Sequence, residues 1–306
     1  MNPTSSVAVS VVIPVYNSAG TIASCIESIV AQQLTDIEVV VVDDGSTDGS
    51  GGICDGYAAA DARIKVVHQP NQGRTAARWR GTSMACGEWI AYVDSDDMLP
   101  KEALSDLLEQ ATDDTDIVLG NGHTLWPECR TSIPMADFRH LAVRAEGTIG
   151  VPWGSLYRRS VLSDYLFDIP RHIYNGEDYL FWLRLVFLTD KPVHVVYKSV
   201  YDKGDEHTSA DFVWTAGYCQ QLDRLRVASI PAEDYHLYAD DALCDRLENL
   251  FAVAVWQRRQ EWVHSPFYLG IRREMQERHR PMSWKQRFFL SLPSLRLRKL
   301  LVKIGT

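Results

Sequence analysis

The sequence predicts an α/β protein with a mostly parallel central sheet flanked by helices, followed by a mainly helical C-terminal extension. Residues 7–15 and 37–42 are β-branched and almost continuously apolar, which is typical of strands that are covered on both faces. Segments with helical spacing alternate with these runs, and polar residues follow each run directly. This alternation predicts right-handed βαβ crossovers, with ligands bound at the carboxyl ends of the strands.

The first half of the chain can be assigned in order. Strands are expected at residues 7–15, 37–42, 63–68 and 89–93. Apolar residues recur at helical spacing at Ile22, Cys25, Ile26, Ile29 and Val30, which predicts a helix after the first strand. A second helix is expected at residues 73–84, after the third strand.

Beyond residue 113 the pattern loosens. A strand is expected at residues 116–120, irregular structure at 126–150 and a short helix from Arg158. A helix is expected at residues 176–186, a strand at 192–197 and mainly helices at 211–280. We therefore predict an α/β domain at residues 1–210 and a helical C-terminal region at residues 211–306.

Composition sets the class of protein. Hydrophobic residues make up 46% of the chain and charged residues 23%, which is ordinary for a folded soluble protein. No apolar run is long enough to span a bilayer, and the N-terminus lacks the pattern of a secretory signal. The six cysteines include no C-x-x-C pair, so neither a zinc site nor a disulfide framework is expected. These features predict a location in the cytoplasm.

Charge is distributed unevenly. From residue 271 onward there are ten Lys/Arg against two Asp/Glu, which leaves 21 Lys/Arg against 38 Asp/Glu before it. The acidic body argues against a nucleic-acid partner. In the basic tail, Trp284 and Phe288 lie beside Lys285 and Arg287, a mixture that favours peripheral binding to an anionic membrane at the inner face of the plasma membrane. The alternatives are packing of the tail on the protein itself or on a second copy in an oligomer.

The segment VDSDD at residues 93–97 places three carboxylates directly after a predicted buried strand. Like charges this close repel one another unless a cation or a hydrogen-bond network offsets them. Three other polar loops, at residues 14–17, 43–44 and 71–73, follow the neighbouring strands. The alternative for any single loop is ordinary turn chemistry, but together the four loops predict one ligand site.

Six motifs carry a resemblance to a known family. They are VVIPVYN (11–17), VVDDGSTD (41–48), NQGRTAAR (71–78), DSD (94–96), WGSLYR (153–158) and GED (176–178). In order and spacing they resemble those of family 2 inverting glycosyltransferases with the GT-A (Rossmann-like) fold. The match runs from about Val7 to about Ser209. Trp79 departs from the family's pattern, which often has Asn there.

The resemblance implies a nucleotide-sugar donor and a divalent metal ion. The implied donor-binding residues are Pro14, Val15, Tyr16, Asp44, Arg74, Arg78, Asp94 and Ser95. Because a carboxylate can accept the imide N–H of uracil, a uridine nucleotide is expected. Asp96 would bind Mn²⁺ or Mg²⁺, since such ions are usually held by one or two carboxylates plus substrate phosphates. His207 is a second possible metal ligand; its alternative is a surface histidine.

The same residues have structural alternatives. Asp44 could form an Asx turn with Gly45, and Tyr16 could be a buried core phenol. Arg74 and Arg78 could be solvated on a helix surface. Asp97 is expected to be the N-cap of a helix rather than a ligand.

The GED motif resembles the segment that supplies the catalytic base. Asp178 is the expected base, which takes the proton of the acceptor hydroxyl, and Glu177 and Trp153 are expected beside the acceptor. The alternatives are a capping pair at a helix N-terminus for the carboxylates and a core aromatic for Trp153.

The sequence therefore predicts a metal-dependent inverting glycosyltransferase. It would use a nucleotide-diphosphate sugar, with UDP expected, and a saccharide or lipid-linked acceptor in bacterial surface polysaccharide or glycolipid synthesis. The alternative is a non-catalytic sugar-nucleotide-binding module. A dehydrogenase is excluded because no G-x-G-x-x-G follows the first strand.

Overall fold

The computed structural model describes residues 7–120, 130–145, 150–204, 212–292, 294–295 and 298–299. The chain forms two compact units. The first comprises Met1–Arg139 and Gly147–His207, and the second comprises His140–Glu146 and Thr208–Thr306.

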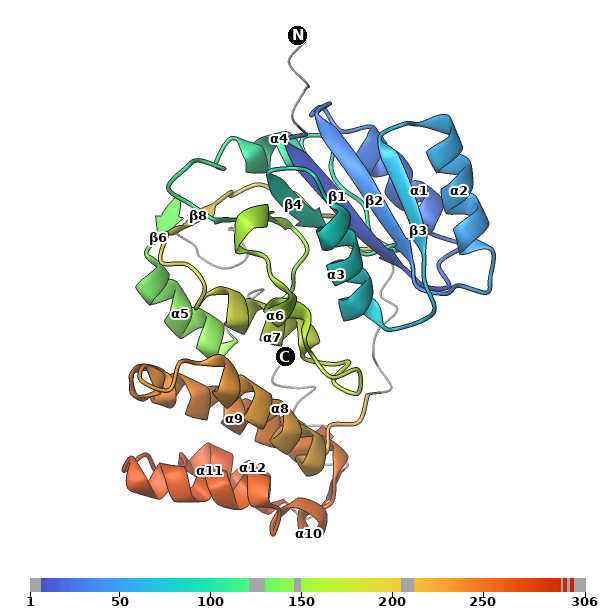
Figure 1. Cartoon of the computed structure of the whole chain (residues 1–306). Helices are drawn as coiled ribbons and strands as arrows, with labels where there is room; N and C mark the ends of the chain where they lie inside the picture. Colours follow the sequence, from blue (N-terminus) through green and yellow to red (C-terminus); the bar gives the residue numbers. More distant parts are fainter. Residues whose placement is uncertain are drawn as a thin grey trace. The chain divides into compact units, whose positions relative to one another are not determined.

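The first unit is built on one eight-stranded sheet with the order β3-β2-β1-β4-β7-β5-β8-β6 (Figure 1). Its strands are β1 (Val9–Val15), β2 (Ile37–Asp43), β3 (Ile64–His68), β4 (Trp89–Tyr92), β5 (Ile117–Leu119), β6 (Ser132–Ile133), β7 (Ser155–Arg158) and β8 (Val193–Val195). The pairs β1–β2, β1–β4, β2–β3 and β5–β8 are parallel. β7 is antiparallel to both β4 and β5, and β6 is antiparallel to β8. The predicted mostly parallel sheet is confirmed.

Helices cover both faces of this sheet, which explains why β1 and β2 are apolar at almost every position. On one face, alternate residues of β1 starting at Val9 pack against α1 (Ile22–Val30), α2 (Ser50–Ala60) and α4 (Ala103–Leu108). On the other face lies α3 (Arg74–Met84), so close that a Cβ at Gly81 would lie 2.4 Å from Val12 Cγ1. α7 (Glu177–Leu185) packs on the same face as α3, where the Phe181 and Tyr92 rings are 5.9 Å apart.

Two predictions between residues 126 and 161 are wrong. The described part of the stretch expected to be irregular contains β6 and the helix α5 (Met135–Arg144). The stretch 152–157, for which no element was predicted, supplies β7, which lies between β4 and β5 in the sheet. The helix expected from Arg158 is a single 3₁₀ turn, Arg159–Val161, followed by the short helix α6 (Asp164–Phe167).

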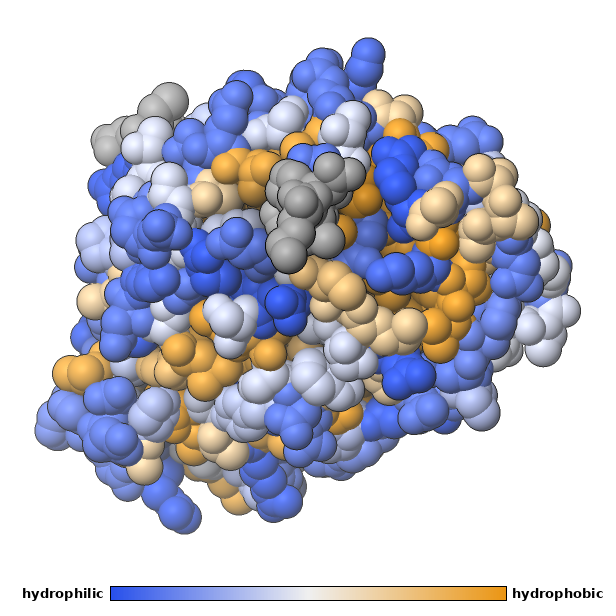
Figure 2. Space-filling view, turned by 45° about the horizontal axis from the view of Figure 1, so that its top comes forward, coloured by the Kyte–Doolittle hydropathy of each residue, from blue (hydrophilic) through white to orange (hydrophobic). Residues whose placement is uncertain are grey.

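The second unit is helical, as predicted. It contains α8 (Ala216–Ser229), α9 (Tyr235–Trp256), α10 (Arg259–Trp262), α11 (Pro266–Glu277) and α12 (Trp284–Ser291). These helices enclose a core that includes Leu250, Val253, Trp262, Phe267 and Ile271. Among the helices of the described residues, none has both the length and the apolar composition needed to cross a bilayer. The face viewed in Figure 2 is largely hydrophilic, with apolar residues in separate groups.

Candidate active site

The loops after β1, β2 and β4 are joined by hydrogen bonds at the carboxyl ends of the strands. The Asn17 amide donates to Ser46 Oγ (3.0 Å), and Asn17 Oδ1 accepts from the Thr47 amide (2.8 Å). The hydroxyls of Ser18 and Ser95 lie 2.7 Å apart. Three loops that are distant in the sequence therefore form one surface, as the parallel pairing of their strands requires.

Asp44 holds the loop after β3 in place. Its buried carboxylate accepts hydrogen bonds from Gln69 Nε2 (2.8 Å), the Gln72 amide (2.9 Å) and the Gly73 amide (2.7 Å). Gly45, with a φ of 78°, packs so closely that a Cβ would lie 2.9 Å from the Asn71 nitrogen. A carboxylate has about four acceptor positions, so roughly one is left for a ligand.

The end of β1 supplies both backbone and an exposed ring. Pro14 and Val15 are buried in the strand, and the Val15 carbonyl accepts from the Asp44 amide (2.8 Å). The next residue, Tyr16, is 52% exposed. The alternative of a core phenol is therefore wrong, and the ring is available to a ligand.

Arg78 connects the loop after β4 with the start of α7. Its side chain is 4% exposed, and its guanidinium donates through Nη2 to Asp94 Oδ1 (2.8 Å) and through Nη1 to Asp178. The solvated alternative is thus wrong for Arg78. Its buried Nε has no hydrogen-bond partner among the residues described.

The charges of this cluster shift the pKa values of its members. Burial opposes the charge on Arg78, but Asp178 and Asp94 outweigh that effect and raise its pKa. Burial likewise opposes ionisation of Asp94, yet Arg78 and Arg74 hold its pKa below the ordinary value. The site therefore keeps both the cation and the Asp94 carboxylate charged.

A second pair lies beside the first. Arg74, one turn before Arg78 on α3, donates to the buried Glu177. Burial, and then repulsion from Asp178, raises the pKa of Glu177 despite this partner. Both carboxylates lie in the first turn of α7, after Gly176 with its φ of 102°. Negative charge is favourable at that position, so the capping alternative and a role in the site are compatible.

Asp97 is not the helix N-cap that the sequence predicted, because α4 begins at Ala103 with Glu102 as its N-cap. Instead, Asp97 accepts from the Tyr201 hydroxyl (2.6 Å) and the Gly204 amide (2.8 Å). Burial raises the pKa of its carboxyl. The Tyr201 oxygen also accepts from the Asp94 amide (3.1 Å).

Sequence reasoning missed Tyr201 and Gly204. A Cβ at Gly204 would lie 2.0 Å from the Asp96 carbonyl oxygen, so only glycine fits there. The segment after β8 is also bridged to the loop after β4, between Met98 and Asp202. The sequence marks residues 201–209 only as a polar loop, which gives no sign of this docking.

Trp153 lies against the same segment. Its ring stacks on Tyr201 with centroids 4.6 Å apart and planes 18° apart. Lys203 Nζ lies 5.4 Å from the Trp153 ring centroid. Trp153 is only partly buried, so part of its ring is open to solvent beside the carboxylate loop.

Asp96 differs from its neighbours. Its carboxylate is partly exposed and makes neither a hydrogen bond nor an ion pair with any described residue. Within the described ranges, no three His, Cys, Asp or Glu side chains are arranged to hold a metal ion. His207, the second expected ligand, lies outside the described residues. The donor set fits a Mg²⁺ or Mn²⁺ held by one or two carboxylates with the remaining oxygens from phosphates and water.

Comparison with known proteins decides the family. The sequence profile of glycosyl transferase family 2 matches residues 10–166, about half of the chain. The chain belongs to glycosyl transferase family 2. This confirms the family inferred from the six motifs.

A relative of this family 2 glycosyl transferase is the putative glycosyltransferase EpsH of Bacillus subtilis, 35% identical over 192 residues, which are 59% of this chain and 56% of EpsH. The chain thus spans about half the length of this relative. Among solved structures, S. aureus TarS 1-349 in complex with UDP-GlcNAc is similar with a TM-score of 0.60 and 21% identity over 89% of each chain. The mannosyltransferase PcManGT of Pyrobaculum calidifontis, in complex with GDP-Man and Mn²⁺, has a TM-score of 0.56 and 18% identity over 92% of this chain and 78% of its own. These similarities confirm the GT-A fold.

Proposed function

We propose that this protein is an inverting, divalent-metal-dependent glycosyltransferase that uses a nucleotide-diphosphate sugar. The acceptor would be a hydroxyl of a saccharide or lipid-linked glycan in bacterial surface polysaccharide or glycolipid synthesis. Family membership supports the reaction class. The observation that carries the proposal is Arg78, whose single guanidinium contacts both Asp94 and Asp178.

Asp178 is the proposed base. Inversion needs a carboxylate on the face of the sugar opposite the departing diphosphate, to take the proton as the acceptor oxygen attacks. A guanidinium spans only a few ångströms, so the shared contact with Arg78 keeps Asp178 close to the carboxylate loop that would face the diphosphate. Arg78 would hold the base in position.

Asp96 is the proposed protein ligand of the metal, with Asp94 beside the ribose or a metal-bound water. The ion, when bound, would neutralise the negative charge that develops on the departing diphosphate. Arg74, with a side chain 46% exposed, would turn toward the phosphates. Without cations, the diphosphate would meet the carboxylates of the loop as like charges.

The nucleoside pocket is proposed between Tyr16 and Asp44. The exposed Tyr16 ring offers an apolar surface for a base, and the remaining acceptor position of Asp44 suits an imide N–H. UDP-GlcNAc in the TarS complex supports a uridine donor, whereas GDP-Man in the PcManGT complex makes guanosine the competitor to test.

The acceptor is proposed to bind beside Trp153 and Glu177. The open part of the Trp153 ring can stack on the apolar face of a sugar, and its packing on Tyr201 fixes its orientation. Burial and repulsion from Asp178 raise the pKa of Glu177, and its carboxyl group would form a hydrogen bond with an acceptor hydroxyl.

A donor screen tests this function. The full chain would be incubated with UDP- and GDP-sugars, with Mn²⁺, and with chelator in place of the metal; released nucleotide and transferred sugar are measured. Metal-dependent release that an acceptor accelerates supports the proposal. Donor binding without release or transfer for any sugar nucleotide would instead identify a non-catalytic binding module.

A further inference from the structure

The helix α12 exposes two large aromatic side chains one turn apart. Trp284 is 68% exposed and Phe288 is 54% exposed, whereas Leu290 on the opposite side is buried in the core of the second unit. Lys285 and Arg287, both exposed, lie on either side of this aromatic pair. The outward face of α12 therefore combines apolar rings with flanking cations.

Two cations near this face form no ion pair with a described residue. Arg287, and Arg272 on the neighbouring α11, form no ion pair with any residue that the structure describes; Arg272 lies 5.9 Å from the Tyr268 ring centroid. By contrast, Arg278 and Arg280, further along the same segment, both pair with Asp240. Arg272 and Arg287 therefore carry positive charge that no described carboxylate offsets.

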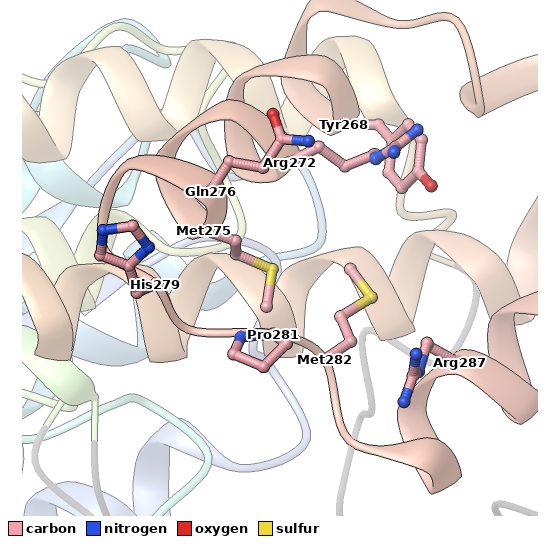
Figure 3. Close-up of a pocket in the computed structure, with 8 residues that line it drawn as sticks. All are labelled: Tyr268, Arg272, Met275, Gln276, His279, Pro281, Met282 and Arg287. Atoms are coloured by element: carbon pink, nitrogen blue, oxygen red, sulfur yellow. The ribbon is translucent and has the colours of Figure 1, made fainter.

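A pocket of about 580 Å³ lies between α11 and α12. Arg272 and Arg287 line it from the two helices, and Met275, Pro281 and Met282 form an apolar wall (Figure 3). In the figure, Met275 of α11 points toward the connecting segment that carries Met282. Cationic side chains over an apolar wall suit a ligand with an anionic head and a hydrocarbon body.

We propose that the face of α12 formed by Trp284, Lys285, Arg287 and Phe288, together with this pocket, binds an anionic lipid bilayer. Trp284 and Phe288 would lie among the headgroups, while Arg272 and Arg287 contact lipid phosphates. A second copy of the chain is the weaker candidate, because a two-fold interface through this face would bring its unpaired cations against themselves. The inference does not depend on the proposed reaction.

Vesicle flotation with the full chain tests it, without donor or acceptor. The vesicles are phosphatidylcholine alone, or phosphatidylcholine with about a third phosphatidylglycerol. Binding is expected only to the anionic vesicles and should weaken as salt rises. K285Q/R287Q should lower the partition coefficient roughly 25-fold, about fivefold for each removed charge, and W284A/F288A by about tenfold or more.

Matched controls use exposed residues elsewhere in the second unit. V227A/L237A removes two exposed apolar side chains, and R224Q removes an exposed cation; both should bind like the wild type. Circular dichroism checks that each variant is folded. The salt dependence of vesicle binding by the wild type tests the proposal even if a variant fails to fold. Three results would each overturn the proposal. The wild type could bind neutral and anionic vesicles equally, or inorganic phosphate could displace it from vesicles at constant ionic strength. The third is that the wild type binds no vesicles and W284A/F288A changes its oligomeric state.

Discussion

Arg78 of α3 forms an ion pair with Asp178 of α7, 100 residues away in the sequence. The same guanidinium also pairs with Asp94 at the end of β4. A buried cation between two carboxylates is stable because each charge offsets the desolvation of the others. Arg78 therefore joins two motifs of the site.

Replacing Arg78 by Met should destabilise the first unit. The change leaves Asp94 and Asp178 close together without their shared cation, and breaking a buried pair in this way typically costs about 3–5 kcal/mol. We expect the lower half of that range, because both carboxylates are partly exposed. Urea unfolding at neutral pH measures the loss.

Arg80→Met is the matched control, since Arg80 lies on the same helix but is exposed. Its free energy of unfolding should change by less than about 0.5 kcal/mol. If the two variants were equally stable, the ion pairs of Arg78 with Asp94 and Asp178 would not hold α7 to the sheet.

The strands that position this site could be predicted from the sequence. β1 and β2 are continuous β-branched runs, so their type and bounds follow from burial on both faces. β7 was missed because it has four residues and no such run, and only its place between β4 and β5 makes it a strand. α5 did carry a signal: Met135, Phe138 and Ala142 are buried at helical spacing, but its many polar residues hid the pattern.

The two carboxylates at the start of α7 should contribute differently to catalysis. Asp178→Asn removes the proposed base, so kcat should fall about 10²–10⁴-fold while donor affinity is retained. Glu177→Gln keeps a hydrogen-bonding side chain next to the acceptor and should affect KM more than kcat. Steady-state kinetics with varied acceptor separates them. A large kcat loss in Glu177→Gln with none in Asp178→Asn would exchange their roles.

Tyr201→Phe should loosen the loop that carries Asp96. The lost hydroxyl leaves the buried Asp97 carboxylate and the Asp94 amide short of a partner, which typically costs about 1–3 kcal/mol. Tyr57→Phe is the control, because it deletes a hydroxyl that bonds the Glu27 carboxylate on the exposed surface (2.6 Å). Thermal unfolding of both variants checks this, and equal melting temperatures would contradict it.

His68 should make stability depend on pH. Hydrogen bonds to Asp43 (2.8 Å) and Asp55 (3.1 Å) raise its pKa. A raised pKa means that the stabilisation is complete below the unfolded value of about 6.5 and is lost as pH rises through the folded value. The melting temperature of His68→Gln relative to the wild type should therefore be lower at about pH 6 than at about pH 8.5. If the difference in melting temperature between the two proteins did not change with pH, the pairing of His68 with Asp43 and Asp55 would contribute nothing to stability.

The individual site residues could be named from motifs, but their partners could not. Asp94 and Asp178 are far apart in the sequence, and only the packing of α3 and α7 on the same face of the sheet brings Arg78 to both. Likewise, no pattern in the sequence indicates that Tyr201 approaches Asp97, because that contact depends on the segment after β8 returning to the loop after β4.

We propose that a divalent cation held by Asp96 connects the protein to the pyrophosphate of the donor. Titration calorimetry of a UDP-sugar into chelator-treated protein, with and without added Mn²⁺, tests it most directly, using Asp96→Asn and the exposed Asp36→Asn as a matched pair. We expect Mn²⁺ to tighten binding by about tenfold or more, equivalent to about 1.4 kcal/mol, in the wild type and in Asp36→Asn but not in Asp96→Asn. Donor affinity that is the same with and without the metal in the wild type would show that no such ion connects the protein to the donor.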